Sequence, residues 1–409
     1  MTVRPARALV AAFLRRLEGG TLRLVDGDGV HTFGAPDEAL RVTVTMHDPG
    51  VWRALLRGST GLGESYMNGR WDADDVTALV RLAARNAPKL DRMRRRFAFI
   101  LRPVQLARQI RPNTPRRARR QIAAHYDLGN DLFALMLDER MLYSSARFER
   151  PDASLEEAQL AKLDDVCAKL ELRPDEHLLE IGTGWGALAI HAAQRYGCRV
   201  TTTTVSRAQY ELARERVRAA GVEDRVTVLL RDYRELEGVY DKLVAIEMIE
   251  AVGWRGFDRF FERCSHLLTP DGLMLLQAIT IDDRAYEVEK AGTSFITTFI
   301  FPGGCLPSLE VMARCVRRRT DLSWLALEDF APDYVLTLRH WRERFLRAEA
   351  QLEALGYDHR FRRLWELYLR YCEAGFAERR ISVVHAVLAK PAHRVPARMS
   401  PAVSSVAHG

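Results

Sequence analysis

The chain has 409 residues, more than one compact core usually holds, so we expect two domains. Hydrophobic residues make up 47% of it, yet no run approaches the ~18–20 apolar residues of a membrane span, which argues against a membrane-spanning protein. The net charge of +7 favours partners with anionic surfaces. The six cysteines show no CxxC pair and no zinc spacing with histidines, so we expect buried free thiols and no metal site.

The first 88 residues predict a small α+β domain. The opening stretch MTVRPARALVAAFLRRLEGG (1–20) places apolar residues at helical spacing, without the long apolar region or cleavage site of a signal peptide. We therefore expect an amphipathic helix and a cytoplasmic protein. Three strands and two helices should follow, at 21–25, 29–33, 40–46, 51–57 and 74–86.

Residues 89–120 form a basic segment. Twelve lysines and arginines lie there against a single acidic residue, Asp91. Such a segment suits an anionic surface, either nucleic acid or lipid headgroups, and equally a solvated linker. Pro103, Pro112 and Pro115 interrupt any long helix, so we expect the segment to connect two domains.

Residues 121–390 predict an α/β domain with a doubly wound sheet. Strands and helices alternate from about residue 155, and near-continuously apolar strands are typical of parallel sheets. The expected strands are 177–181, 199–205, 225–230, 242–248, 272–281 and 381–389. The expected helices are 155–171, 186–196, 206–220, 254–268, 332–355 and 358–375. The tail 391–409 is rich in Pro, Ser and Ala and should be disordered.

The stretch LLEIGTGWG (178–186) leads from the first of these strands through a glycine-rich turn into a helix. Gly182, Gly184 and Gly186 allow a tight turn and a close approach to a ligand. A dinucleotide enzyme would carry a carboxylate for the ribose at the end of the second strand, where TTTTVS (201–206) has none. Glu180 would instead face an amine or a sulfonium. This combination favours S-adenosylmethionine over NAD.

Several long motifs occur in the order of a known family. They are GLGESYMNGRW (61–71), AHYDLGNDLFALMLDERMLYSSARF (124–148), LEIGTGWG (179–186), EMIEAVG (247–253), FIFPGGCLPS (299–308) and APDYVLTLRHWRERF (331–345). The chain resembles the cyclopropane-fatty-acyl-phospholipid synthase family, which includes the mycolic acid and tuberculostearic acid methyltransferases. EMIEAVG and LLQAITI look closer to the tuberculostearic branch. The resemblance implies a class I methyltransferase sheet, mostly parallel with an antiparallel final strand, after a smaller N-terminal α+β domain.

The resemblance also implies a cradle for S-adenosylmethionine. It places Tyr143 and Ser144 near the methionine end of the cofactor, and Asp232 and Tyr233 near the adenine. The other expected contacts are Glu180, Gly182, Gly184, Trp185, Gly186, Thr204, Ser206 and Gln209. Core packing is the alternative role for Tyr143, and capping of the next helix is an alternative for Thr204 and Ser206.

The family's reaction needs a base, and its members bind a bicarbonate ion with a Cys, a Glu, a His and a Tyr. Glu250 and Tyr334 match the Glu and the Tyr, whereas Ser145 and Gln277 replace the Cys and the His. A hydroxyl and an amide still bind an anion, so bicarbonate remains compatible. The alternative is that a carboxylate takes the proton itself, with Glu250 as the first candidate and Glu149 as the second.

The reaction implied is transfer of a one-carbon unit from S-adenosylmethionine to the cis double bond of an unsaturated phospholipid chain, such as oleoyl. It proceeds through a carbocation and gives a 10-methylene chain, which a reductase partner could reduce, or a cyclopropane. A non-catalytic paralogue that binds lipid or cofactor is the alternative, because Ser145 and Gln277 depart from the pattern. EMIEAVG lacks the Pro-Pro-aromatic run of a base-flipping enzyme, which argues against nucleic acid as the substrate.

The partners implied are phospholipids at a membrane surface. The basic segment would dock the protein peripherally on the inner face of the membrane. Phe295, Phe299 and Phe301 would wall an acyl tunnel, with core packing as the alternative. A homodimer is compatible with the resemblance.

Overall fold

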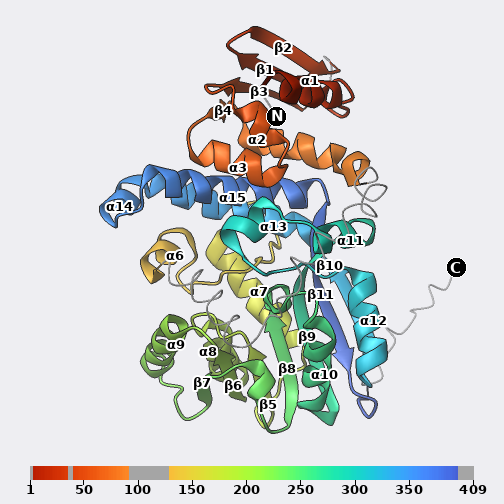
Figure 1. The fold of residues 1–409 in the computed structure, drawn as a ribbon. Helices are drawn as coiled ribbons and strands as arrows, with labels where there is room; N and C mark the ends of the chain where they lie inside the picture. Colours follow the sequence, from red (N-terminus) through yellow and green to blue (C-terminus); the bar gives the residue numbers. More distant parts are fainter. Residues whose placement is uncertain (1–2, 36–39, 92–128, 395–409) are drawn as a thin grey trace, which may run out of the picture.

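The computed structural model describes residues 3–35, 40–91 and 129–394. Two sheets organise these residues: a four-stranded sheet near the N-terminus and a seven-stranded sheet in the remainder (Figure 1). Most of the basic segment (92–120) and most of the tail (395–409) lie outside the described residues, so the predictions for them stay predictions.

The four-stranded sheet has the order β2-β1-β3-β4. β1 (Thr21–Asp26) pairs antiparallel with β2 (Gly29–Gly34) and parallel with β3 (Arg41–Met46), which pairs antiparallel with β4 (Trp71–Ala73). Its helices are α1 (Val3–Leu14), α2 (Val51–Leu55), α3 (Ser59–Met67) and a helix over 76–91. The predicted helix at the N-terminus and the three predicted strands are present, whereas α3 and the short strand β4 were not predicted.

The seven-stranded sheet has the order β10-β11-β9-β8-β5-β6-β7. Its strands are β5 (His177–Ile181), β6 (Arg199–Thr204), β7 (Val226–Leu230), β8 (Tyr240–Ile246), β9 (Leu268–Ile281), β10 (Ser323–Asp329) and β11 (Ile381–Ala389). The first five are mutually parallel, and β11 runs antiparallel to both β9 and β10. The predicted α/β class, with a mostly parallel sheet and an antiparallel final strand, is confirmed.

Helices cover both faces of this sheet because its strands are apolar on both sides. One face buries Leu178, Val200 and Val244 against α7 (Leu155–Lys169), α8 (Ala187–His191) and α9 (Arg207–Ala219). The other face buries Leu179, Leu243 and Leu276 against α10 (Phe257–His266) and α12 (Leu309–Arg319). Alternate residues of one strand therefore serve two separate cores. The remaining helical elements are α6 (Asn130–Met136), η1 (Ala192–Tyr196), η2 (Tyr233–Glu235), η3 (Ile249–Val252), α11 (Asp283–Ala291), η4 (Ile296–Ile300), α13 (Ala331–Arg347), α14 (Glu349–Ala354) and α15 (His359–Ala377).

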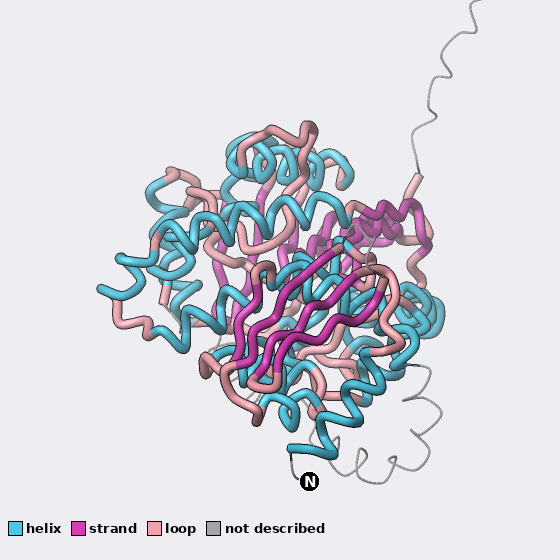
Figure 2. The backbone as a smooth tube through the Cα atoms, turned by 90° about the horizontal axis from the view of Figure 1, so that it is seen from above, coloured by secondary structure: helices cyan, strands magenta, loops and turns pink. Residues whose placement is uncertain are grey.

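The N-terminal part, of which residues 3–35 and 40–91 are described, packs on α15. Figure 2, which looks down from the N-terminal side, shows the four-stranded sheet lying over helices, with the larger sheet beyond them. Arg363 of α15 stacks its guanidinium 3.8 Å from the Tyr66 ring centroid, and Glu378 pairs with Arg81 and Arg85 at 2.7 and 2.8 Å. A single hydrophobic cluster includes buried residues of both parts. The two parts therefore share a core across this contact.

Some predicted elements differ from those observed. The predicted helix 332–355 is α13 followed by α14, with Ala348 between them, and the predicted helix 186–196 is α8 followed by the π-helix η1. β10 was not predicted because it is an edge strand whose side chains are mostly exposed, so it lacks the apolar pattern of its neighbours.

Two predictions from composition are tested by the described residues. All six cysteines are free thiols, and five of them are buried. Among the described helices, none combines the length and apolar character that crossing a membrane requires.

Candidate active site

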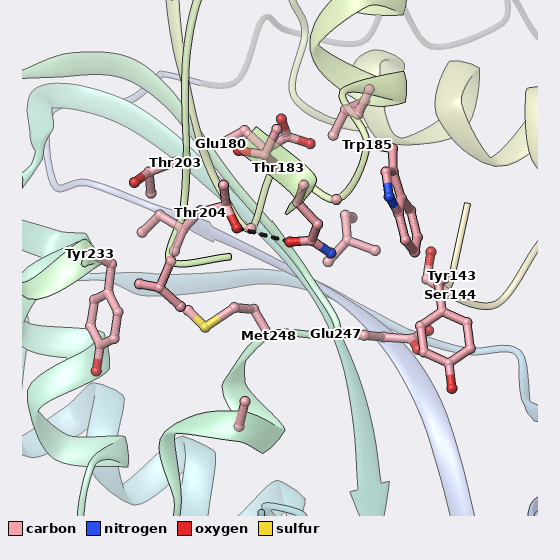
Figure 3. A pocket seen from close by; sticks show the side chains of 18 of the residues that line it. Tyr143, Ser144, Glu180, Thr183, Trp185, Thr203, Thr204, Tyr233, Glu247 and Met248 are labelled. Atoms are coloured by element: carbon pink, nitrogen blue, oxygen red, sulfur yellow. Dashed lines mark hydrogen bonds between the residues drawn. The ribbon is translucent and has the colours of Figure 1, made fainter. Parts of the chain in front are cut away.

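A cavity of about 320 Å³ opens at the carboxyl ends of β5, β6, β7 and β8. Ligands of doubly wound sheets bind at this edge, and small-molecule sites start at about 300 Å³. Figure 3 shows its extent: Tyr233 lies at one end, Tyr143, Ser144 and Glu247 lie at the other, and Met248 lies between them. The cavity is therefore long enough to hold one ligand against several strand ends.

The glycine turn after β5 forms one wall of this cavity. Gly182 has a φ of +106°, which a side chain rarely adopts, and both its N–H and that of Thr183 donate to the Thr203 carbonyl at 3.0 Å. Gly182, Gly184 and Trp185 line the cavity. Gly186 is not among the residues that line it; it instead precedes α8 in a left-handed conformation. The turn thus presents its backbone to the cavity.

Two buried titratable side chains, Glu180 and Lys162, also line the cavity. Glu180 accepts a 2.6 Å hydrogen bond from Thr202, and burial raises its pKa to about 8. Lys162, on α7, donates to the Ser144 hydroxyl at 2.7 Å, and burial lowers its pKa to about 8 although the charges of Glu247, Asp138 and Glu180 act in the opposite direction. Lys162 was not predicted, because a lysine on a helix normally indicates the solvated face.

Residues after β6 and β7 form the end of the cavity near Tyr233. Thr204 donates to the Gln209 side chain at 2.8 Å, and both line the cavity (Figure 3). Ser206 is not among the lining residues, and its hydroxyl accepts the Gln209 N–H as the N-cap of α9. The capping alternative for Ser206 therefore describes its position better than direct ligand contact. Asp232 and Tyr233 both line the cavity, and Asp232 pairs with Arg234 at 2.6 Å.

Glu247 lies at the opposite end and was not among the predicted site residues. Its Oε1 accepts the Ser145 backbone N–H and the Gln277 amide, both at 2.8 Å, and its Oε2 accepts the Tyr334 hydroxyl at 2.6 Å. Burial raises the pKa of Glu247, while these hydrogen bonds and the charge of Lys162 act to lower it. Three of the four residues expected to bind bicarbonate therefore surround a carboxylate of the chain itself.

The two predicted carboxylates are placed differently. Glu250 accepts the Ile279 N–H with one oxygen, and its other oxygen is buried without a hydrogen-bond partner among the described residues. Burial and the charge of Glu247 raise the pKa of Glu250 to about 8. Glu149 is exposed and is not one of the described residues that line the cavity. The structure does not bring Glu149 to the site: it lies four residues beyond the buried Ser145, where the chain is exposed.

A second layer of polar side chains supports Gln277. His385 of β11 contacts the Gln277 amide oxygen at 2.9 Å, and its other ring nitrogen lies 3.0 Å from the Lys169 ammonium. Burial lowers the pKa of His385 to about 4, so the ring is neutral, donates to Gln277 and accepts from Lys169. The ligand atoms of Asp165, Glu328 and His385 lie close enough together to hold a metal ion. The ammonium of Lys169 already occupies this place, 2.6 Å from each carboxylate.

Aromatic side chains surround the end of the cavity that holds Glu247. The Tyr143 and Tyr368 hydroxyls are 2.7 Å apart, and Tyr143 packs on Trp341 with ring centroids 5.2 Å apart. Tyr143 therefore lines the cavity and also packs in the core. Phe301 packs edge-on against Tyr368, at 6.0 Å.

The phenylalanines expected to wall an acyl tunnel do not share one environment. Phe295 is buried against Phe299 and Tyr371, and a Cβ on Gly63 of α3 would lie 2.3 Å from its ring. Core packing therefore accounts for Phe295, whereas Phe301 reaches the aromatic group beside the cavity.

These residues fit one of the two groups that the sequence implies. The glycine turn, Glu180, the Thr204–Gln209 pair and Asp232 suit an adenosyl ligand with a cationic amino acid end. A bicarbonate ion fits poorly, because the Gln277 amide and the Tyr334 hydroxyl already hold Glu247, and the Ser145 hydroxyl donates to the Ala146 carbonyl at 3.1 Å.

The comparisons with known proteins give a consistent family. Residues 113–386 match the family described as mycolic acid cyclopropane synthetase. The chain is 40% identical over 388 residues to the tuberculostearic acid methyltransferase UfaA1 of Mycobacterium tuberculosis, covering 91% of this chain and 90% of that protein. It is 38% identical over 341 residues to the cyclopropane-fatty-acyl-phospholipid synthase of Escherichia coli, covering 83% and 85%.

Solved structures show the same likeness over the larger part of the chain. The cyclopropane synthase MmaA2 from Mycobacterium tuberculosis superposes with a TM-score of 0.62 at 31% identity, and covers 66% of this chain and 98% of that one. The mycolic acid cyclopropane synthase CmaA1, complexed with SAH and CTAB, gives a TM-score of 0.62 at 33% identity, with the same coverage.

Proposed function

The chain belongs to the mycolic acid cyclopropane synthetase family of S-adenosylmethionine-dependent methyltransferases, and from this premise we propose that it methylates the cis double bond of unsaturated phospholipid acyl chains. The observation that carries the proposal is the end of the cavity that holds Glu247: a carboxylate with three donors, enclosed by aromatic rings. That arrangement suits a reaction that makes a cation in an apolar site and then removes a proton.

S-adenosylmethionine supplies an electrophilic methyl group on a sulfonium centre. An alkene is a weak nucleophile, so the chain must hold its double bond in line with that methyl and exclude water. Methylation leaves a carbocation on the acyl chain, which faces such as those of Tyr143 and Trp185 can stabilise. Proton loss from the new methyl closes a cyclopropane. A hydride shift before proton loss gives an exocyclic methylene instead.

We favour the methylene product. The relative at 40% identity is named as a tuberculostearic acid methyltransferase, and the cyclopropane synthase of Escherichia coli is a little less similar. A 10-methylene chain from oleoyl would then need a separate reductase to become a methyl branch. Cyclopropane formation is the second candidate, supported by the names of the solved relatives.

We also propose that the basic segment brings the protein to an anionic bilayer at the inner face of the membrane. Its first described residues adjoin the N-terminal part, where Lys89 pairs with Glu18 at 2.6 Å. Sedimentation with vesicles tests this: binding should be stronger to anionic than to neutral vesicles and should weaken as salt rises. Equal binding to both kinds of vesicle at low salt would refute the docking role.

The test of the function is incubation with methyl-deuterated S-adenosylmethionine and oleoyl-phospholipid vesicles, followed by mass spectrometry of the acyl chains. Both products retain two deuteriums, so the chains are also ozonised, which cleaves a methylene and leaves a ring intact. A cleavable product supports the methylene assignment, and an intact ring supports the cyclopropane. No label in the lipid, with cofactor binding intact, would refute the proposal and favour the non-catalytic alternative.

A further inference from the structure

The carboxylate of Glu247 is held from three separate elements. The Ser145 N–H comes from the loop after α6, Gln277 from β9 and Tyr334 from α13. Ser145 and Gln277 are fully buried and Tyr334 is 5% exposed, so the donors are fixed before any ligand arrives. Three donors on one carboxylate favour its charged form and oppose the burial that raises the pKa of Glu247. The site therefore contains preformed donors for an anion, and a carboxyl group of the chain itself occupies them.

The backbone conformation of Glu247 is also unusual. Glu247 has a φ of +49°, one of four positive values at non-glycine residues among the described residues. A left-handed conformation is unfavourable for a residue that carries a side chain. It persists here because β8 has just ended at Ile246 and the Glu247 N–H donates to the Gln277 carbonyl at 2.8 Å. Strain of this kind is typical of functional positions.

The second carboxylate has the opposite environment. Glu250 receives a backbone N–H on one oxygen, and its other oxygen has no partner among the described residues. With a pKa of about 8, Glu250 is mostly protonated at neutral pH. Two neighbouring carboxyl groups whose surroundings separate them in this way divide the roles of acid and base. The carboxylate whose hydrogen bonds favour the charged form is Glu247, which also lines the cofactor cavity.

We propose that Glu247 is the base that removes the proton from the transferred methyl carbon, and that the enzyme works without bicarbonate. The inference rests on the proposed function and identifies its proton acceptor. The methyl C–H bond breaks and its proton moves to a Glu247 oxygen. The bonding pair forms either the new ring bond or, after the hydride shift, the exocyclic double bond. Glu247 then releases the proton to solvent when the product leaves.

The decisive variant is Glu247→Gly, because glycine adopts a φ of +49° without strain and leaves the three donors around an empty space. The matched control is Glu247→Gln, which fills the same space but cannot take a proton. Calorimetry should show that both variants bind S-adenosylmethionine within a few-fold of the wild type. Loss of the base should lower the methylation rate by about 100-fold or more in both.

Small anions then separate a catalytic role from a structural one. Formate or bicarbonate at millimolar concentration should restore activity in Glu247→Gly and not in Glu247→Gln, and removal of carbon dioxide should leave the wild type unaffected. A wild type that requires bicarbonate, a Glu247→Gly variant that keeps full activity, or rescue that is absent or equal in both variants would overturn the inference.

A binding experiment makes the inference independent of the substrate. Carbon-13 NMR with labelled bicarbonate should detect binding to Glu247→Gly and not to the wild type. Bicarbonate bound by the wild-type protein would overturn the inference even if no lipid is methylated. A wild type that methylates no lipid, with this NMR result unchanged, would refute only the proposed function.

Discussion

Replacing Tyr334 by phenylalanine should move the pH dependence of the reaction and leave its maximum almost unchanged. The Tyr334 hydroxyl donates to Glu247 at 2.6 Å, while its ring stacks on Phe376 with centroids 4.3 Å apart. Phenylalanine keeps the stacking and removes one donor. A hydrogen bond to a charged group contributes about 1.5–3 kcal/mol, which corresponds to a rise of about 1–2 units in the pKa of Glu247.

The sign of the effect follows from which form of Glu247 is active. The base must be ionised, so a higher pKa moves the acid limb of the rate profile to higher pH by the same amount. At a fixed pH on that limb the rate falls by about 10–100-fold, and above it the rate recovers. Other groups that act on Glu247 electrostatically stay in place and affect both proteins alike. They are Lys162, Glu250, Cys372 and Tyr368.

The assay is kcat against pH for the wild type and Tyr334→Phe. Tyr240→Phe is the matched control, because the Tyr240 hydroxyl donates to the Glu237 carbonyl at 3.1 Å and the residue is not among those that line the cavity. The control should keep the wild-type profile. If Tyr334→Phe loses activity equally at every pH, the hydroxyl does not act through the ionisation of Glu247, and the reasoning is refuted.

Three further predictions concern residues around the site. Lys162→Met should weaken S-adenosylmethionine binding about tenfold or more in calorimetry. It removes the buried ammonium that favours the charged form of Glu180, the carboxylate expected to face the cationic end of the cofactor. An unchanged Kd would contradict this. Glu378→Ala should lower the free energy of unfolding in urea by about 1 kcal/mol with kcat unchanged, since its arginine partners are partly exposed; a kcat effect alone would count against this. The pKa of His385 is about 4 in the folded state and higher when unfolded, so stability should fall as pH drops from 6.5 towards 4. His385→Gln should flatten that slope, and equal slopes would exclude this contribution.

Most of the fold could be predicted from local sequence patterns. The apolar strands β5, β6, β8 and β9 alternate with helices and lie close to their predicted limits. The glycine turn was predictable because only glycine adopts the φ of +106° that Gly182 shows. Edge strand β10 was not, since its exposed side chains give no signal.

The site was predicted only in part. Ser145, Gln277 and Tyr334 do meet, but around Glu247, three residues before the expected Glu250 in EMIE. Strand alternation does not apply to Glu247, because it follows the end of β8 and takes a left-handed conformation. The sequence did offer one signal: EMIE (247–250) holds two glutamates just after strand β8, and either of them could be the site carboxylate.

His385 was missed for a different reason. It lies within the apolar strand VVHAV (383–387), where a single histidine is usually interpreted as a core residue. Its contact with Gln277 depends on how β11 is aligned with β9, where the two residues are paired. Pairing between strands about a hundred residues apart cannot be read from either strand alone.

Because the two parts of the chain share a core, the N-terminal part should bind to the rest of the chain and stabilise it, as a ligand does. Its Trp71 and Leu24 belong to the same buried cluster as Trp365 and Tyr334. A cut between residues 91 and 129 would therefore leave two pieces held by their apolar faces and by the Arg363 contacts. Binding of one piece would stabilise the other in proportion to the logarithm of its concentration. Two separately produced fragments should thus rebuild the shared buried cluster only when mixed.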